Sequence, residues 1–180
     1  MGKILFIIGR SATGKSTICN ELVKRLNFKP VISHTSRPIR EGEINGIDYH
    51  YISKIEFFIE ILKGNMLEHT KYNGWSYGVH KNSIDDDNYI MVSDPVGFKK
   101  LKKKFPNCMS VYITTDDKKK LIRSLEREEH PNCDEICRRF LSDRKTFKAI
   151  EKKVDYVVEN NGSLDDTVNK IIELMNERWI

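Results

Sequence analysis

Among the residues of this chain that are equipped for chemistry, the most informative are two glycines, a lysine and a serine near the N-terminus. The octapeptide Gly9-Arg10-Ser11-Ala12-Thr13-Gly14-Lys15-Ser16 fits the pattern G-x-x-x-x-G-K-[ST] of a phosphate-binding loop. An apolar run, Ile4–Ile8, precedes it and indicates a buried strand, and apolar residues at helical spacing follow it as far as Leu26. Strand, loop and helix therefore occur in the order that the pattern requires.

The physics of such a loop defines its ligand. The glycines let the backbone curl until successive N–H groups point at one phosphate, and the N-terminus of the following helix adds partial positive charge. Lys15 would reach the β- and γ-phosphates, and the Ser16 hydroxyl would ligate Mg²⁺. A chance glycine turn before an ordinary helix is the alternative. The expected ATP-binding residues are Gly9, Arg10, Ser11, Ala12, Thr13, Gly14, Lys15, Ser16 and Thr17.

Length and composition indicate one compact domain. The chain has 180 residues, of which 39% are hydrophobic and 32% charged, and its formal net charge is +5. The lysine-rich stretch 99–104 is typical of a solvated helix face, so no nucleic acid is expected as a partner. No apolar stretch is long enough to span a membrane and the N-terminus does not look like a signal peptide, so we expect a cytoplasmic protein.

The four cysteines do not form a recognisable framework. Cys19 and Cys108 fall in apolar patterns and are expected to be buried thiols in a reduced protein. His130, Cys133 and Cys137 lie close together in the sequence, which leaves a metal site conceivable. It lacks a second cysteine pair or an obvious fourth ligand, so it is the weaker interpretation.

Apolar patterns alternate between strands and helices along the chain. Strands are expected at 4–8, 31–33, 48–52, 66–69, around 75–77, and at 89–92, 108–113 and 154–158; helices are expected after Ser16, at 55–62, from Pro95, around 121–125, along the stripe from Ile136 to Ile150, and around 168–175. The segments near Trp75 favour a small antiparallel unit. The rest predicts an α/β fold with a mostly parallel central sheet covered on both faces.

Seven further segments carry a resemblance to a known family. They are Ser33-His34-Thr35-Ser36-Arg37-Pro38-Ile39-Arg40-Glu41-Gly42-Glu43, Gly46–Tyr51, Leu67-Glu68, Tyr77-Gly78 and, later, Lys104-Phe105-Pro106, Val111–Ile113 and Asp155–Val158 with Asn160. With the phosphate loop, they make the chain resemble the guanylate kinases, which phosphorylate GMP with ATP. The resemblance implies a P-loop NTPase three-layer fold, with a small α+β GMP-binding region and a helical lid. It also implies a single domain over 1–180, with its core at 1–32, 89–115 and 150–180, the GMP-binding region at 33–88 and the lid at 116–149.

The resemblance also implies the roles of individual residues. Those expected to contact GMP are Ser33, Arg37, Arg40, Tyr49, Glu68, Tyr77 and Asp94; Asn160 joins the ATP-binding set, and Lys15, Arg37 and Arg139 are expected to be catalytic. Taken alone, Arg37 and Arg40 beside two glutamates are typical of surface ion pairs. Two guanidinium forks also suit a monophosphate, and the Glu68 carboxylate suits the paired donors of guanine, which adenine lacks. Mg²⁺, ATP and GMP, and dGMP as a second acceptor, follow as the expected cofactor and substrates.

The chain departs from the family pattern at several positions. Val79 stands where a hydroxyl residue is usual, and Val92 and Val96 stand where the family has Asp and Gln. The usual lid arginine aligns with Glu128-Glu129-His130, so Arg127 would have to substitute for it, and Arg144 is a further candidate for a phosphate contact beside Arg139. Altered base selectivity and slower turnover are therefore expected.

Two rival functions remain at this point. The same fold would serve another phosphate-bearing acceptor, which Val79 and Val92 favour. Alternatively, guanylate-kinase-like domains that bind phosphorylated peptides resemble this fold without catalysis, but those typically lack an intact phosphate loop. The oligomeric state is expected to be a monomer or a homodimer.

Overall fold

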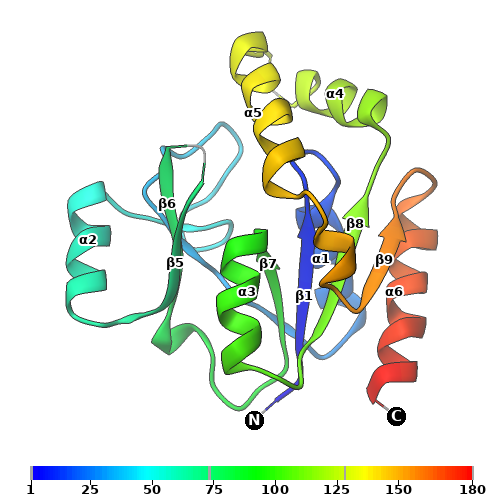
Figure 1. Cartoon of the computed structure of the whole chain (residues 1–180), viewed down its shortest axis with the longest axis horizontal. Coiled ribbons are helices and arrows are strands. Elements are labelled where there is room, and N and C mark those ends of the chain that lie inside the picture. The colour runs from blue at the N-terminus through cyan, green and yellow to red at the C-terminus, as the bar shows by residue number, and fades with distance from the viewer. Residues whose placement is uncertain (1, 73, 128, 180) are drawn as a thin grey trace.

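The computed structural model of the chain describes residues 2–72, 74–127 and 129–179. Within these residues the centre is a parallel five-stranded sheet (Figure 1). Its order is β2 (Lys29–Pro30), β7 (Tyr89–Ser93), β1 (Ile4–Gly9), β8 (Met109–Thr114) and β9 (Tyr156–Glu159). The expected parallel sheet is confirmed, and β1 lies at its middle, where the phosphate loop leaves it.

Both faces of the sheet are covered by helices because β1 is apolar without interruption. All six residues of β1 are buried. Ile4, Phe6 and Ile8 face the core formed with α3 (Pro95–Lys104), whereas Leu5 and Ile7 face α1 (Lys15–Arg25) and α6 (Leu164–Trp179). A strand buried on both faces needs such a continuous run. The three-layer arrangement therefore follows from the pattern in the sequence.

The strand expected at 31–33 is wrong in its position. The chain pairs with the central sheet at Lys29–Pro30, and the Val31 N–H still donates to the Ile90 carbonyl at 2.9 Å. It then leaves that sheet and pairs in a second one as β3 (His34–Thr35). Pro30 lacks an N–H and is tolerated because β2 is an edge strand with a single neighbour. The apolar 31–33 segment is the crossing between the two sheets.

A smaller sheet forms the second part of the molecule, in the order β4 (His50–Tyr51), β3, β6 (Trp75–His80) and β5 (Met66–Tyr72). The β3–β6 and β5–β6 pairs are antiparallel, which confirms the expected antiparallel unit, while β3 and β4 are parallel. Helix α2 (Lys54–Leu62) precedes β5. It begins with a capping box in which Ser53 and Glu56 exchange side-chain-to-backbone hydrogen bonds.

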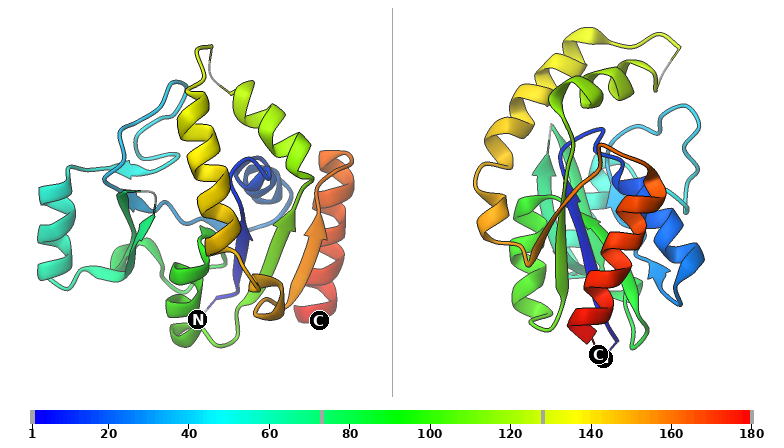
Figure 2. Two further views of the ribbon diagram at one scale, coloured as in Figure 1. Left: turned by 45° about the horizontal axis from the view of Figure 1, so that its top comes forward. Right: turned by 90° about the vertical axis from the view of Figure 1, so that its right-hand side faces the viewer.

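Two helices form the third part, α4 (Asp117–Leu125) and α5 (Cys133–Thr146). Figure 2 shows them beyond the carboxyl ends of β1 and β8, so that they overhang the phosphate loop. The expected break between them at Pro131 is present. After α5 the chain returns to the core through Ala149, which has a positive φ of 60°, and the short 3₁₀ helix η2 (Ile150–Lys152). A second 3₁₀ turn, η1 (Lys81–Ser83), links β6 to β7.

The structure also bears on the cysteines, on a metal site and on membrane-spanning helices. Cys19 and Cys108 are buried free thiols, as expected, and Cys133 and Cys137 are exposed. Over residues 2–72, 74–127 and 129–179, no three His, Cys, Asp or Glu side chains come together in a way that would hold a metal ion. In the same part of the chain, none of the helices combines the length and apolarity needed to cross a membrane.

Candidate functional site

The phosphate loop has the conformation for which its glycines are needed. A Cβ at Gly9 would lie 2.6 Å from the Thr13 hydroxyl oxygen and 3.0 Å from the Ile113 carbonyl oxygen. Gly14 has φ +88°, and a Cβ there would lie 2.6 Å from the side-chain nitrogen of Asn160. Gly14 is also the N-cap of α1, so Lys15 and Ser16 form its first turn. Each glycine is therefore required by close approach of other atoms, and Gly14 also by its backbone angle.

The loop is supported from below by Asn160. Its Nδ2 donates to the Thr13 carbonyl at 2.9 Å, and its Oδ1 accepts from the Thr167 hydroxyl at 3.0 Å. Asn160 and Thr13 are both buried, and neither lines the cavity described below. The structure therefore places Asn160, expected among the ATP-binding residues, beneath the loop, where its amide joins the loop to α6.

Lys15 lies at the floor of the site. Its Nζ donates to the Arg10 carbonyl at 2.8 Å. Burial lowers its pKa to about 8; Asp143 acts in the opposite direction, whereas Arg127 and Arg139 lower it further. A bound phosphate would restore the positive charge, because an opposite charge favours the ammonium form. The Arg10 side chain points away from this site, with one guanidinium nitrogen 3.9 Å from a carboxylate oxygen of Asp117 on α4.

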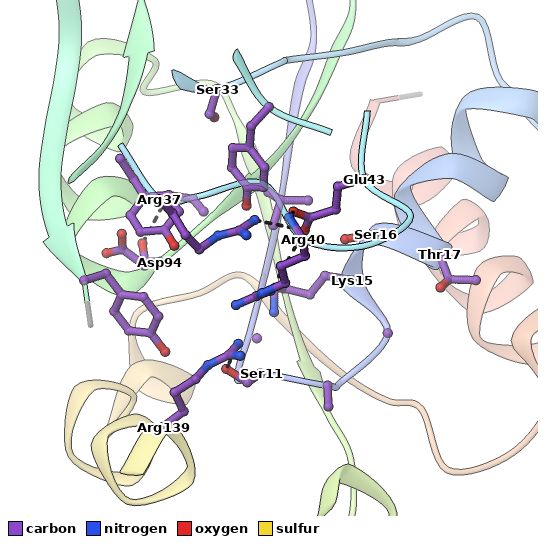
Figure 3. Close-up of a pocket in the computed structure, with 18 of the residues that line it drawn as sticks. Ser11, Lys15, Ser16, Thr17, Ser33, Arg37, Arg40, Glu43, Asp94 and Arg139 are labelled. Atoms are coloured by element: carbon purple, nitrogen blue, oxygen red, sulfur yellow. Dashed lines mark hydrogen bonds and ion pairs between the residues drawn. The ribbon is translucent and has the colours of Figure 1, made fainter. Parts of the chain in front are cut away.

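One cavity of about 450 Å³ joins the phosphate loop, the smaller sheet and α5. Among the expected site residues, those that line it are Gly9, Ser11, Ala12, Gly14, Lys15, Ser16, Thr17, Ser33, Arg37, Arg40, Tyr49, Glu68, Tyr77, Asp94 and Arg139. Figure 3 shows Lys15, Arg40 and Arg139 directing their nitrogen atoms toward the same region. Arg10, Thr13 and Asn160 are the expected residues that lie outside it. The positive groups therefore converge where two phosphate chains would meet.

Arg37 is held in place by a glutamate that the sequence reasoning left out of the site. Its side chain is 6% exposed and its guanidinium donates to Glu43 Oε1 at 2.9 Å, so the pair is not on the surface. The other oxygen of Glu43 accepts from the Arg40 N–H and from the Tyr51 hydroxyl. Burial opposes the charge on Arg37, but Glu43 and nearby tyrosines raise its pKa overall. Glu43 thereby orients the arginine loop, and its place in the Arg-x-Gly-Glu segment was the available signal.

Arg40 is set among other cations. Burial, and then the neighbouring Arg139 and Arg37, lower its pKa. Such a cluster is unfavourable in isolation, because like charges repel in a partly desolvated site. It becomes favourable when an anion lies between the guanidinium groups. The cavity is therefore electrostatically prepared for phosphate oxygens.

Glu68 also lines the cavity and is buried. Its Oε2 is buried and has no hydrogen-bond partner among the described residues. Burial raises its pKa to about 7, with Asp94 adding to the rise and Lys100 and Lys104 opposing it. A ligand carrying adjacent N–H donors would satisfy this carboxylate. The guanine base fits this requirement.

Asp94 and Val79 lie next to Glu68. Asp94 caps α3, since its Oδ1 accepts from the N–H groups of Val96 and Gly97, and its Oδ2 accepts from the Thr70 hydroxyl at 2.8 Å. It lines the cavity with both oxygens already engaged. Val79 is 2% exposed, lines the same cavity and belongs to the apolar core. The hydroxyl side chain that is usual in the family is thus replaced by the apolar side chain of Val79, which packs in the core.

Helix α5 brings Arg139 into contact with the phosphate loop. One guanidinium nitrogen of Arg139 donates to the Ser11 hydroxyl at 3.1 Å. Arg127 also lines the cavity, whereas Arg144 lies outside it and pairs with Asp117 at 3.2 Å. Of the Glu128-Glu129-His130 turn, Glu128 lies outside the described residues. Arg127 is therefore better placed than Arg144 to serve as a second lid arginine.

Two side chains that the sequence did not single out join α5 to the smaller sheet and to the phosphate loop. Tyr72 lines the cavity, and its hydroxyl donates to Asp143 on α5. Asp143 is buried and accepts from the backbone N–H of Ser11 at 2.6 Å. Asp143 follows Arg139 by one helical turn, and this spacing was the signal that would have found it.

Comparison with known proteins identifies the family that the chain resembles in sequence. The sequence model of the guanylate kinase family matches residues 1–178. A guanylate kinase of Fusobacterium nucleatum subsp. nucleatum is 29% identical over 180 residues, which cover 97% of this chain and 96% of that protein. A guanylate kinase of Clostridium perfringens (strain 13 / Type A) is 30% identical over 176 residues, which cover 94% of this chain and 81% of that protein.

A solved structure agrees with the fold. The crystal structure of guanylate kinase from Anaplasma phagocytophilum matches with a TM-score of 0.77 at 23% identity, covering 99% of this chain and 87% of that one. At this identity the match supports the three-layer P-loop fold alone. With the family model matching almost the whole length, this chain belongs to the guanylate kinase family.

Proposed function

We propose that this protein transfers the γ-phosphoryl group of ATP to GMP, giving ADP and GDP, and that dGMP also serves as acceptor. The observation that carries the proposal is that one cavity is lined both by most of the phosphate loop and by arginine, tyrosine and glutamate side chains of the smaller sheet and its loops. A triphosphate on the loop and a monophosphate near Arg37 and Arg40 would meet end to end. In-line transfer needs this arrangement.

The acceptor is recognised at both of its ends. Arg37 and Arg40, with the hydroxyl groups of Tyr49 and Tyr77, would hold the monophosphate by charge-assisted hydrogen bonds. Glu68 would accept from N1–H and the exocyclic amine of guanine. AMP would leave that carboxylate partly unpaired, which is a strong basis for rejection.

Transfer itself requires alignment more than proton chemistry. The acceptor phosphate is already an oxyanion near neutral pH, so no general base is needed. Lys15 and Arg139 would neutralise charge on the γ-phosphoryl group, while Arg37 and Arg40 present the acceptor. The largest contribution is then electrostatic preorganisation, because these groups occupy a partly dehydrated cavity and do not need to reorient.

Magnesium would be held mainly by the nucleotide. Ser16 lines the cavity in the first turn of α1 and supplies one hydroxyl ligand, and Val92, at the end of β7, offers none. Mg²⁺ commonly keeps several waters and binds through substrate phosphates, so one protein ligand is compatible with its chemistry. A bound ion would help to neutralise the negative charge that develops on the phosphates.

The three parts of the fold are proposed to move during the cycle. We assign the core to 1–32, 89–115 and 150–180, the GMP-binding region to 33–88 and the lid to 116–149. Closure of the last two over both nucleotides would exclude water and limit wasteful ATP hydrolysis. The active unit would be a monomer or a homodimer.

The test is ADP release from ATP and Mg²⁺ with GMP, dGMP, AMP, CMP and UMP offered separately. GMP and dGMP are expected to support turnover, the other three are not, and EDTA is expected to stop it. Lys15→Ala should abolish transfer while leaving GMP binding largely intact. Turnover with AMP, or silence with all five acceptors, would contradict the proposal.

A further inference from the structure

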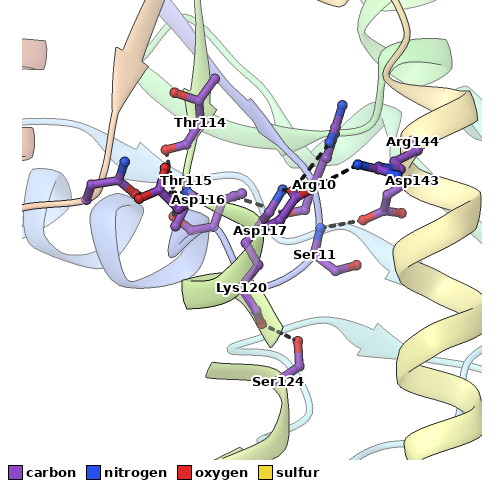
Figure 4. Close-up of polar contacts among 12 residues, drawn as sticks. Arg10, Ser11, Thr114, Thr115, Asp116, Asp117, Lys120, Ser124, Asp143 and Arg144 are labelled. Carbon is purple, nitrogen blue, oxygen red and sulfur yellow. Dashed lines mark hydrogen bonds and ion pairs between the residues drawn. The ribbon is translucent and has the colours of Figure 1, made fainter. Parts of the chain in front are cut away.

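The feature that the proposed reaction leaves unexplained is a buried carboxylate on the lid. Asp143 is 2% exposed, although a carboxylate taken out of water costs free energy unless it is well partnered. Its Oδ2 accepts from the Ser11 N–H at 2.6 Å, and its Oδ1 accepts from the Tyr72 hydroxyl. Figure 4 shows the contact with Ser11 reaching from α5 to the phosphate loop. This one side chain joins the lid, the core and the smaller sheet.

The partners of Asp143 are suited to a fixed contact. Burial, and then the neighbouring Asp143, raise the pKa of Tyr72 above its ordinary value, so its hydroxyl keeps the proton that it donates. Both carboxylate oxygens of Asp143 are thus engaged by protein donors, and the positive charge of Lys15 lies near. A buried carboxylate whose two oxygens already accept from the protein has little capacity left to bind substrate. Any effect of Asp143 on the reaction must therefore act through the parts of the structure that it holds together.

What it holds is the helix that carries Arg139. Arg139 precedes Asp143 by four residues, so the two side chains project from the same face of α5. Both reach Ser11, one at its hydroxyl and the other at its backbone N–H. The helix is therefore docked on the loop at two neighbouring points. Loss of the Asp143 contact would let Arg139 change its position relative to the γ-phosphate.

We propose that Asp143, with Tyr72 as its partner, is a positioning residue that docks the lid on the phosphate loop and so places Arg139 against the transferred phosphoryl group. This inference rests on the proposed kinase reaction and adds to it. It also couples the two sides of the site, because Tyr72 belongs to the strand β5 that carries Glu68. The position of the GMP-binding region and the closure of the lid then both depend on the Asp143 carboxylate.

The decisive test is a double-mutant cycle between Asp143 and Arg139, measured by steady-state kinetics. Asp143→Ala is expected to lower kcat by about tenfold to a hundredfold, as misplacement of a catalytic group does, with less than about a threefold change in KM for ATP. In an Arg139→Ala background the same change should cost less than about twofold. An equal loss in both backgrounds would overturn the inference.

Conservative and control variants separate docking from simple loss of stability. Asp143→Asn keeps an acceptor for the Ser11 N–H and should recover most of the lost kcat. Tyr72→Phe should lower kcat in the same direction as Asp143→Ala but by less. Asp134→Ala, at an exposed acid on the same helix, should change neither kcat nor KM. A lower KM for ATP with kcat retained in Asp143→Ala would mean that the carboxylate competes with phosphate, and would refute positioning.

A measurement without turnover distinguishes this inference from the proposed function. Asp143→Ala should accelerate hydrogen exchange of residues 133–146 while leaving β1 and β8 protected. Unchanged exchange of that helix would overturn the docking role even if the enzyme is active. Wild-type protein that releases no ADP with any nucleotide would refute the kinase proposal, and the exchange experiment would still judge the contact.

Discussion

Replacing Glu68 by Gln should make the protein more stable and a poorer enzyme at the same time. Glu68 is 8% exposed, its buried Oε2 has no hydrogen-bond partner among the described residues, and its pKa rises from 4.5 to about 7 because of burial. At about 1.36 kcal/mol per pH unit, this rise corresponds to roughly 3 kcal/mol that opposes folding once the group is ionised. Gln carries no charge and escapes that cost. Its own buried amide limits the net gain.

The sign follows from which state holds the proton. The folded protein binds the Glu68 proton more tightly than the unfolded chain, so this group's contribution to stability is complete below pH 4.5 and is lost as pH rises through about 7. Gln does not titrate. Between pH 4.5 and pH 8, the free energy of unfolding of the wild type should therefore fall by up to about 3 kcal/mol relative to that of Glu68→Gln. This corresponds to a fall of about 1–2 M in the urea midpoint.

GMP binding should weaken in Glu68→Gln although the protein becomes more stable. Losing a charged acceptor for guanine costs about 1.5–3 kcal/mol, which raises KM for GMP by roughly tenfold to 150-fold. In the wild type, KM for GMP should also fall as pH rises from 6 to 8, beyond the change caused by the phosphate of GMP itself. Glu68→Gln should show only the phosphate's change.

The assays are urea unfolding at pH 5 and pH 8 and GMP saturation curves at fixed ATP. Glu177→Gln, at an exposed acid on α6, is the matched control and should alter neither the urea midpoint nor KM for GMP. The reasoning is refuted if wild type and Glu68→Gln show the same pH dependence of the urea midpoint. It is also refuted if KM for GMP changes less than about twofold.

Further expectations concern the loop and the base pocket. KM for ATP should rise above about pH 8, where burial lets Lys15 lose its charge; a flat profile to pH 9.5 would contradict this. Val79→Thr should lower KM for GMP by about threefold to tenfold through one added hydrogen bond and lower the melting temperature, since it buries a hydroxyl; an unchanged KM would make that departure irrelevant. Asn160→Ala should reduce stability by about 1–3 kcal/mol and raise KM for ATP but not for GMP, because it removes the bonds to Thr13 and Thr167; an unchanged melting curve would argue against this support.

The elements of the fold were predictable wherever one pattern dominated locally. The apolar run of β1 and the Pro95 start of α3 appear where expected. The helix expected along the stripe from Ile136 to Ile150 instead ends at Thr146, because the backbone turns at Ala149 and Ile150 lies in η2. The 31–33 strand failed because a short apolar segment does not reveal which of two sheets it joins. Its apolar residues serve the crossing, while exposed Lys29 and Pro30 make the edge pairing.

The site was predictable in its residue types more than in its contacts. Fifteen expected residues line the cavity, yet Asn160 supports the loop from beneath, and both oxygens of Asp94 are engaged, capping α3 and accepting from Thr70. Such assignments depend on which polar partner is nearest after folding. Resemblance to a family transfers positions, but it does not report where each hydrogen bond is made in this chain.

The sequence by itself determined the ligand class and the layering, because the phosphate loop and the apolar periodicities are encoded by neighbouring residues. Only the tertiary structure decided how the buried charges are matched. Ser11 and Asp143 are 132 residues apart, and Tyr72 and Asp143 are 71 apart, so no local pattern brings them together. Buried polar groups must find partners, and the partner available to each is set by the three-dimensional fold.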